Sequence, residues 1–145
     1  MPSLFVIRTD KGENLQSKLL DDWNWPMRAF EHRGKLFYFH QHYFSTAKTF
    51  AFYVTMAEHS SEADKYLAKM TLKNQNDDRK SLSIAQNVIS MDLAPSDSKA
   101  VLASKSVIYV PWRTMSGFMK WRDITKEGKL QTESNVDATI HILVN

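Results

Sequence analysis

The chain of 145 residues carries a formal net charge of +3, and 43% of its residues are hydrophobic against 24% charged. This composition predicts a single domain over residues 1–145 and argues against a disordered polypeptide. Cysteine is absent, which excludes disulfide frameworks, cysteine-based zinc fingers and cysteine nucleophiles. We find neither a signal peptide nor an apolar run of the ~20 residues that cross a bilayer, so we expect no membrane association and a location in the cytoplasm or the nucleus.

The first half of the chain predicts mainly strands. Residues 1–24 show no clear pattern and form either an N-terminal extension or a first strand. Trp25–Glu31 and Leu36–Phe44 flank Gly34, which suits the turn of a β-hairpin. Leu36–Phe44 is aromatic on both of its faces, which indicates a strand covered from two sides. Thr49–Glu58 alternates its phenylalanine, valine and methionine residues and predicts the next strand.

This period-two pattern continues through the middle of the chain. Lys65–Lys73 alternates apolar side chains with lysine and threonine, and the Asn/Asp-rich residues 74–78 predict a turn behind it. The next strands are expected at Ser81–Met91 and, after a loop, at Lys99–Val110. The second of these ends before Pro111, because proline has no backbone N–H to donate to a ladder.

The C-terminal part predicts one further strand and little helix. Val136–Val144 alternates alanine, isoleucine and valine on the side expected to face the core. Helical signals are confined to short turns within Asn14–Trp23, Ser60–Asp64 and Ser116–Ile124. Seven or eight strands, with turn signals about every 8–12 residues, predict an all-β fold, an antiparallel β-sandwich.

The end of the chain carries a family resemblance. Trp112 is followed by Ser-Gly-Phe-Met-Lys-Trp at residues 116–121, Asp-Ile at 123–124, Gly-Lys-Leu at 128–130 and the terminal strand. This order of elements resembles the C-terminal signature of the MATH/TRAF-C family, whose β-sandwich domains bind peptides. The aromatic strands of Trp25–Tyr53 are similar to a second family with this sandwich, the substrate-binding domain of the seven-in-absentia ubiquitin ligases.

The resemblance implies a non-enzymatic protein-interaction module. It would bind short extended peptide segments of partner proteins at a groove or a sheet edge, as an adaptor or substrate receptor linked to ubiquitin pathways. Avidity through a homo-oligomer is expected, because a single-peptide groove binds with modest affinity. Trp112 stands for the family's groove tryptophan, Met115 for its groove phenylalanine and Ser116 for a peptide-contacting serine, whereas Trp121 is implied to be a core residue. The implied peptide-binding residues are Tyr109, Trp112, Arg113, Met115 and Ser116.

Catalysis, nucleic-acid binding and metal binding find less support. The sequence has no hydrolase or nucleotide-binding motif, so we expect neither an enzyme nor a cofactor. Its lysines are scattered among acidic residues and do not form the stripe that follows a phosphate backbone. His40 and His42 share one strand face, but no third ligand lies at a suitable spacing, so no metal site is predicted.

Two alternatives to peptide binding stay open. The first is a carbohydrate- or small-ligand-binding sandwich that uses Trp23, Trp25 and the face of His40 and His42. The second is a structural oligomerisation domain, in which the aromatic edge of Leu36–Phe44 is buried between copies of the chain.

Overall fold

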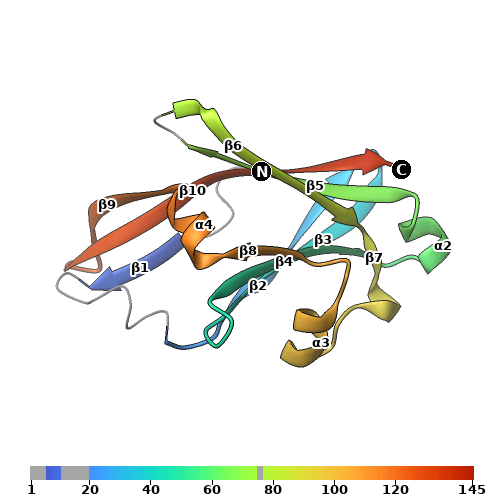
Figure 1. The fold of residues 1–145 in the computed structure, drawn as a ribbon, viewed down its shortest axis with the longest axis horizontal. Helices are drawn as coiled ribbons and strands as arrows, with labels where there is room; N and C mark the ends of the chain where they lie inside the picture. Colours follow the sequence, from blue (N-terminus) through green and yellow to red (C-terminus); the bar gives the residue numbers. More distant parts are fainter. Residues whose placement is uncertain (1–5, 11–19, 75–76) are drawn as a thin grey trace.

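A computed structural model of the protein describes residues 6–10, 20–74 and 77–145. These residues form two sheets of five strands each, which pack face to face (Figure 1). The expected all-β antiparallel sandwich is thereby confirmed, with ten strands in the described residues where we expected seven or eight. In chain order the strands are β1 (Val6–Asp10), β2 (Trp23–His32), β3 (Lys35–Phe44), β4 (Thr49–Met56), β5 (Tyr66–Asn74), β6 (Asp77–Asn87), β7 (Ile89–Ser90), β8 (Ile108–Pro111), β9 (Met119–Lys126) and β10 (Lys129–Val144).

The first sheet is organised around β10. Its strand order is β1-β10-β5-β6, and β9 also pairs with β10. β10 is 16 residues long: residues 129–136 pair with β9, residues 131–135 with β1 and residues 137–144 with β5, all antiparallel. The β9–β10 hairpin reaches past the end of the second sheet on the left of Figure 1.

The second sheet has the order β2-β3-β4-β7, and β8 also pairs with β4. The β2–β3 hairpin turns at Arg33 and Gly34, with φ angles of 50° and 77°. Two consecutive positive φ values match the right-handed twist of the flanking strands, which explains the glycine at this position. Between Trp25 and Arg28 the β2–β3 register shifts, in the stretch where Pro26 has no backbone N–H to donate.

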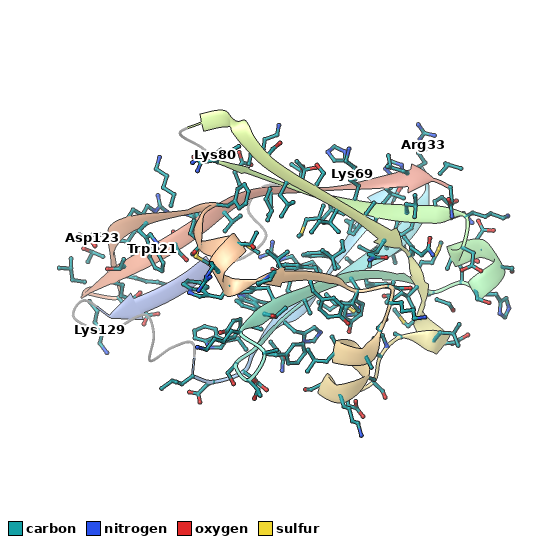
Figure 2. All side chains as sticks on the ribbon, in the orientation of Figure 1. Arg33, Lys69, Lys80, Trp121, Asp123 and Lys129 are labelled. Carbon is teal, nitrogen blue, oxygen red and sulfur yellow. The ribbon has the colours of Figure 1, made fainter. Side chains whose placement is uncertain are left out.

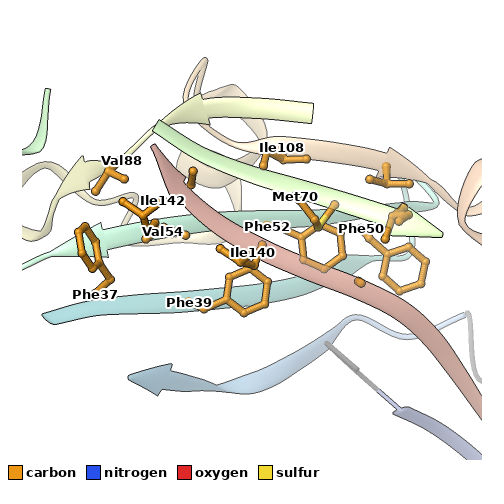
Figure 3. Packing of buried hydrophobic residues seen from close by; sticks show 14 of the residues in the cluster. Phe37, Phe39, Phe50, Phe52, Val54, Met70, Val88, Ile108, Ile140 and Ile142 are labelled. Atoms are coloured by element: carbon orange, nitrogen blue, oxygen red, sulfur yellow. The ribbon is translucent and has the colours of Figure 1, made fainter. Parts of the chain in front are cut away.

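The main core fills the space between the sheets (Figure 3). Alternate residues of β3 and β4 point inward, and each such phenylalanine is completely buried. Burying a side chain of this size contributes roughly 1.5–3 kcal/mol. Gln41 lies in the same inward row at 0% exposure, and its side-chain amide has no partner among the described residues. The inward residues of β3, β4 and the first sheet include Phe37, Phe39, Phe50, Phe52, Val54, Met70, Leu72, Ala138, Ile140 and Ile142.

A second, smaller cluster lies on the outer face of the second sheet. Phe44, Ala51 and Tyr53 point to this side and pack with Val101 and Val107. Val101 belongs to the helix α3 (Ser98–Ala103). β4 is therefore buried on both faces, whereas β3 is buried on its inner face and partly covered on its outer face, where Leu36 stays 48% exposed.

The strand expected at Lys99–Val110 is wrong over most of its length. α3 occupies its first part, because the Asp97 side chain accepts a hydrogen bond from the Ala100 N–H over 2.7 Å and caps the helix. Only the last few expected residues belong to β8, which begins at Ile108.

Three other short helical segments lie within the described residues. They are α2 (Ser60–Ala63), which confirms the expected turn, the 3₁₀ helix η1 (Met91–Leu93) and α4 (Trp112–Ser116). The brief helix expected within Ser116–Ile124 is not found there. α4 ends at Ser116, and β9 occupies most of that segment. Trp121 of β9 is 39% exposed rather than buried in the core, and Figure 2 shows it beside Asp123 and Lys129 on the projecting hairpin.

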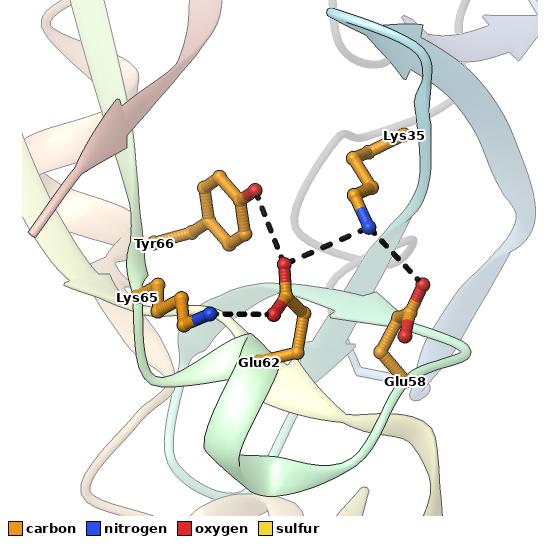
Figure 4. Close-up of polar contacts among 5 residues, drawn as sticks. All are labelled: Lys35, Glu58, Glu62, Lys65 and Tyr66. Atoms are coloured by element: carbon orange, nitrogen blue, oxygen red, sulfur yellow. Dashed lines mark hydrogen bonds and ion pairs between the residues drawn. The ribbon is translucent and has the colours of Figure 1, made fainter.

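A small group of charged side chains joins α2 to the β2–β3 hairpin (Figure 4). Lys35 Nζ lies 3.5 Å from a Glu58 carboxylate oxygen and 3.6 Å from one of Glu62. Lys65 Nζ contacts the other Glu62 oxygen at 2.9 Å. These groups face solvent, so they contribute little to stability.

Candidate functional site

β8 is an edge strand of the second sheet. It pairs with β4 on one side, whereas no strand in the described part of the chain pairs with its other side. β6, an edge strand of the first sheet, approaches β8 on this same side of the sandwich. An unpaired strand presents backbone N–H and C=O groups that another extended chain can bind.

The hydrogen-bond pattern of β8 fixes which backbone groups face outward. The Trp112 N–H donates to the Lys48 carbonyl over 2.8 Å, which continues the β4–β8 register by one pair. Bonded and non-bonded pairs alternate along an antiparallel ladder. Val110 therefore turns its backbone groups toward β4, whereas Tyr109 turns its N–H and C=O toward the open side. Pro111 adds a carbonyl there but no donor.

α4 follows β8 directly and contains four of the five predicted peptide-binding residues, three of which are at least partly exposed beside this edge. Trp112 is half-buried, and its ring centroid lies 6.2 Å from that of Phe50 at an interplanar angle of 37°. Arg113 and Ser116 are exposed, and the Ser116 hydroxyl donates to the Arg113 carbonyl over 2.9 Å. An aromatic ring supported from beneath and two exposed polar side chains thus lie next to open backbone.

The side chains of the other two predicted residues point elsewhere. Met115 is 0% exposed and packs in the main core, so it cannot touch a peptide on the surface. Tyr109 lies on the outer face of the second sheet, where its hydroxyl is within hydrogen-bond distance of the carbonyl oxygens of Val101 and Ser104. Burial raises the pKa of Tyr109, which keeps this hydroxyl protonated as a donor. Tyr109 therefore contributes only its backbone N–H and C=O groups to the open side of β8, and not its side chain.

One residue that the sequence analysis did not single out holds the far end of α4. Asn74, the last residue of β5, donates its side-chain amide to the Gly117 carbonyl over 3.1 Å. This bond ties the first sheet to the turn behind α4. The sequence signal was an asparagine in a polar turn, which does not distinguish a local backbone contact from a contact with a distant loop.

The histidines and tryptophans of the carbohydrate alternative lie on opposite faces of the second sheet. Trp23 and Trp25 pair with inward residues of β3 and pack against the main core, with their ring centroids 6.0 Å apart. His40 and His42 point to the outer face, where the His40 ring stacks on Tyr53 with a centroid distance of 4.4 Å. The four residues therefore do not form one binding surface.

The two histidines are held neutral by their surroundings. His40 Nε2 lies 2.9 Å from Thr55 Oγ1. Burial, with a smaller contribution from the charge of His42, lowers the pKa of His40 to about 4. Burial also lowers the pKa of His42. Among the residues that the structure describes, no three histidine, aspartate or glutamate side chains gather as metal ligands.

The aromatic strand proposed for oligomerisation is not an edge. β3 lies between β2 and β4 and pairs with both, and its inward aromatic residues are buried within one chain. It therefore offers no aromatic edge to a second copy.

None of the helices in the described ranges is long and apolar enough to cross a membrane.

The open side of β8 and the exposed surface of α4 thus remain as the candidate binding site. Their geometry is that of an edge strand with a half-buried aromatic residue at its end. No protein-family model matches the chain, and no curated protein matches it either. The resemblance to the MATH/TRAF-C family stays a prediction from the order of the C-terminal motifs.

Proposed function

We propose that the protein is a peptide-binding module that takes an extended segment of a partner protein as an added strand along β8. The observation that carries this proposal is the unpaired side of β8, where Tyr109 offers a backbone donor and acceptor. An incoming strand would satisfy these groups and would extend the second sheet by one strand.

α4 supplies the side-chain part of the proposed site. Trp112 offers a rigid apolar surface with few rotamers to freeze, because Phe50 supports its ring. Arg113 and Ser116 are exposed and can bind polar groups of the peptide. Met115 supports this segment from the core and takes no part in contact. A single added strand buries little area, so we expect micromolar affinity, about −8 kcal/mol.

The cellular role follows from the family resemblance alone. We propose that the module acts as an adaptor or substrate receptor connected with ubiquitin pathways. Co-precipitation of a ubiquitin ligase with the wild-type protein, but not with an Arg113→Ala, Ser116→Ala double variant, would support this role. Normal ubiquitin-ligase recovery with the double variant would contradict a role that works through this edge.

The test of peptide binding starts from a peptide selected on the intact protein by display or array. Singly N-methylated versions of that peptide remove one backbone donor each, while the protein stays unchanged. We expect every second position along the peptide to lose about tenfold in affinity and the positions between them to change little, because only alternate amides face β8. Equal losses at all positions, or no losses, would rule out strand addition.

Variants then locate the site on the protein. Arg113→Ala should weaken peptide binding severalfold without changing the unfolding midpoint, because the side chain is exposed. Lys129→Ala, on the projecting hairpin, is the matched control and should bind normally. Trp112→Ala should weaken binding further, and its midpoint must be measured because the ring packs on Phe50.

A further inference from the structure

A separate pocket lies on the outer face of the second sheet and takes no part in strand addition. Its volume is about 280 Å³, at the low end of the range for small-molecule sites. One wall is the sheet and the other is the segment that leads into α3. The lining residues are Asn24, His42, Phe44 and Tyr53 from the sheet, and Pro95, Ser96, Asp97, Ser98 and Val101 from the opposite wall.

Hydrogen bonds fix the protonation of the sheet wall. His42 Nδ1 lies 2.6 Å from Asn24 Oδ1, and His42 Nε2 lies 3.3 Å from the Tyr53 hydroxyl. A carboxamide oxygen only accepts, so Nδ1 carries the proton and Nε2 accepts from Tyr53. Burial lowers the pKa of His42 and raises that of Tyr53, which keeps both groups neutral. The wall then has a donor left at the Asn24 amide nitrogen and an acceptor left at the Tyr53 oxygen.

The opposite wall is mainly acceptor in character. One carboxylate oxygen of Asp97 caps α3 through the Ala100 N–H, and the other has no hydrogen-bond partner that we can identify in the described residues. Ser96 and Ser98 add exposed hydroxyl groups, while Phe44 and Val101 supply apolar surface. The lining contains no lysine or arginine within the part of the chain that the structure describes.

This combination of groups selects the class of ligand. An anion would be repelled by Asp97 and would find no cation among the lining residues. An apolar ligand would leave the amide, phenol and carboxylate groups without partners, which is costly. A simple ammonium ion can only donate, so it uses the acceptors of the lining but makes no hydrogen bond with the Asn24 amide N–H, which stays with water. A neutral molecule with several hydroxyl groups both donates and accepts.

We infer that this pocket binds a small neutral polyol of about the size of a monosaccharide. The Asp97 carboxylate accepts from ligand hydroxyls, the Asn24 amide donates to a ligand oxygen, and the Tyr53 oxygen accepts. The inference is independent of the peptide-binding edge, because Tyr53 and Asp97 lie on the outer face of the sheet and not along the open side of β8.

The experiment is an NMR titration of the ¹⁵N-labelled full chain with the methyl glycosides of glucose, galactose and mannose. We expect saturable shifts, in the millimolar range for at least one glycoside, confined to the Asn24 side-chain amide and residues 95–101. Tyr53→Phe keeps the ring but removes the hydroxyl, and should weaken binding about tenfold. Ser98→Ala is exposed and should weaken it severalfold without affecting folding.

Tyr38→Phe is the matched control, because Tyr38 lies on the same outer face but outside the pocket. It should leave glycoside binding unchanged. The inference is overturned if no glycoside gives saturable shifts, if the shifts map outside the pocket, or if ethylammonium chloride alone gives a response. Unchanged binding in both Tyr53→Phe and Ser98→Ala would overturn it as well.

Discussion

The outer faces of the two sheets differ although both belong to one sandwich. On the first sheet most outward residues of β5 and β6 are polar, with Lys69 and Thr71 at least partly exposed and Thr71 Oγ1 lying 2.9 Å from Ser83 Oγ. On the second sheet the outward residues of β3 and β4 are aromatic rings and histidines, and α3 covers part of them. The first face needs only water as a partner, whereas the second face must be covered by protein.

This contrast explains why the pocket beside α3 lies on the second sheet. A solvated face of lysine, threonine and serine has no enclosed space and competes with water for every contact. A covered aromatic face leaves a pocket at the margin of its cover, where the sheet and the segment before α3 form two walls. The cover itself depends on a few anchoring contacts, which substitutions can remove one at a time.

The largest expected difference concerns Phe44, which is 4% exposed in the outer cluster. Phe44→Ala should lower the free energy of unfolding by about 3 kcal/mol, because it leaves a cavity under α3. Thr71→Ala at an outward position of the first sheet is the matched change and should cost less than about 1 kcal/mol. Urea unfolding of both variants measures the difference, and equal losses would show that α3 covers little.

Acid should destabilise the outer face of the second sheet through His40. Its pKa is about 4 in the folded protein, below the ordinary value of 6.5, so the folded state binds fewer protons than the unfolded state. Above pH 6.5 neutral His40 therefore contributes its full share to the free energy of unfolding. This share is lost as the pH falls from 6.5 toward 4, because the unfolded state takes up the proton first. We expect a loss on the order of 1–2 kcal/mol after allowing for solvent screening.

Urea unfolding across this pH range measures the effect, with His40→Gln for comparison. Glutamine can keep the contact with Thr55 but does not titrate, so the variant should show a flatter dependence between pH 6.5 and 4. An equally steep dependence in the variant would assign the acid sensitivity to other groups.

The anchor of α3 is expected to have a smaller effect. Tyr109→Phe removes the hydroxyl that reaches the carbonyl oxygens of Val101 and Ser104, and should cost about 1 kcal/mol. Amide hydrogen exchange should show faster exchange in α3 than in β4. Tyr38→Phe on the same face is the control, and a matching loss there would remove the special role of Tyr109.

The smallest effect is expected on the solvated face of the first sheet. Lys69→Thr places a good strand former at an outward position of β5, and the free energy of unfolding should change by less than about 0.5 kcal/mol. Thermal unfolding of the variant and the wild type, at low and at high salt, measures this change in stability. A large loss would mean that this face is covered by something, as the second sheet is.

Sequence patterns predicted the fold class and most strands because alternation reports directly on burial. The alternation in Lys65–Lys73 predicted a strand with one face in water, and the aromatic pattern of Leu36–Phe44 predicted a strand covered from two sides, which holds for its inner face and in part for its outer face. α3 was missed because a six-residue helix shows less than two full turns of periodicity. Its best signal was Asp97, a good N-cap residue in a segment assigned to a loop.

The candidate site could be predicted only in part. The location of Trp112, Arg113 and Ser116 could be predicted, because these residues follow Pro111 at the end of the edge strand. Which backbone groups of β8 lie open depends on the register with β4, and no residue pattern encodes it. The burial of Met115 depends on how α4 packs on the core. The same holds for Gln41, whose buried amide no alternation rule would predict.

The placement of β10 governs the order in which the molecule is built. Both β1 and β5 pair with β10, so β1 and the edge of β5 that faces away from β6 can pair only after β10 has been made. Until then that edge of β5 stays open, and an open strand edge favours association with other chains. The high sequence separation of the β1–β10 contacts also predicts slow folding.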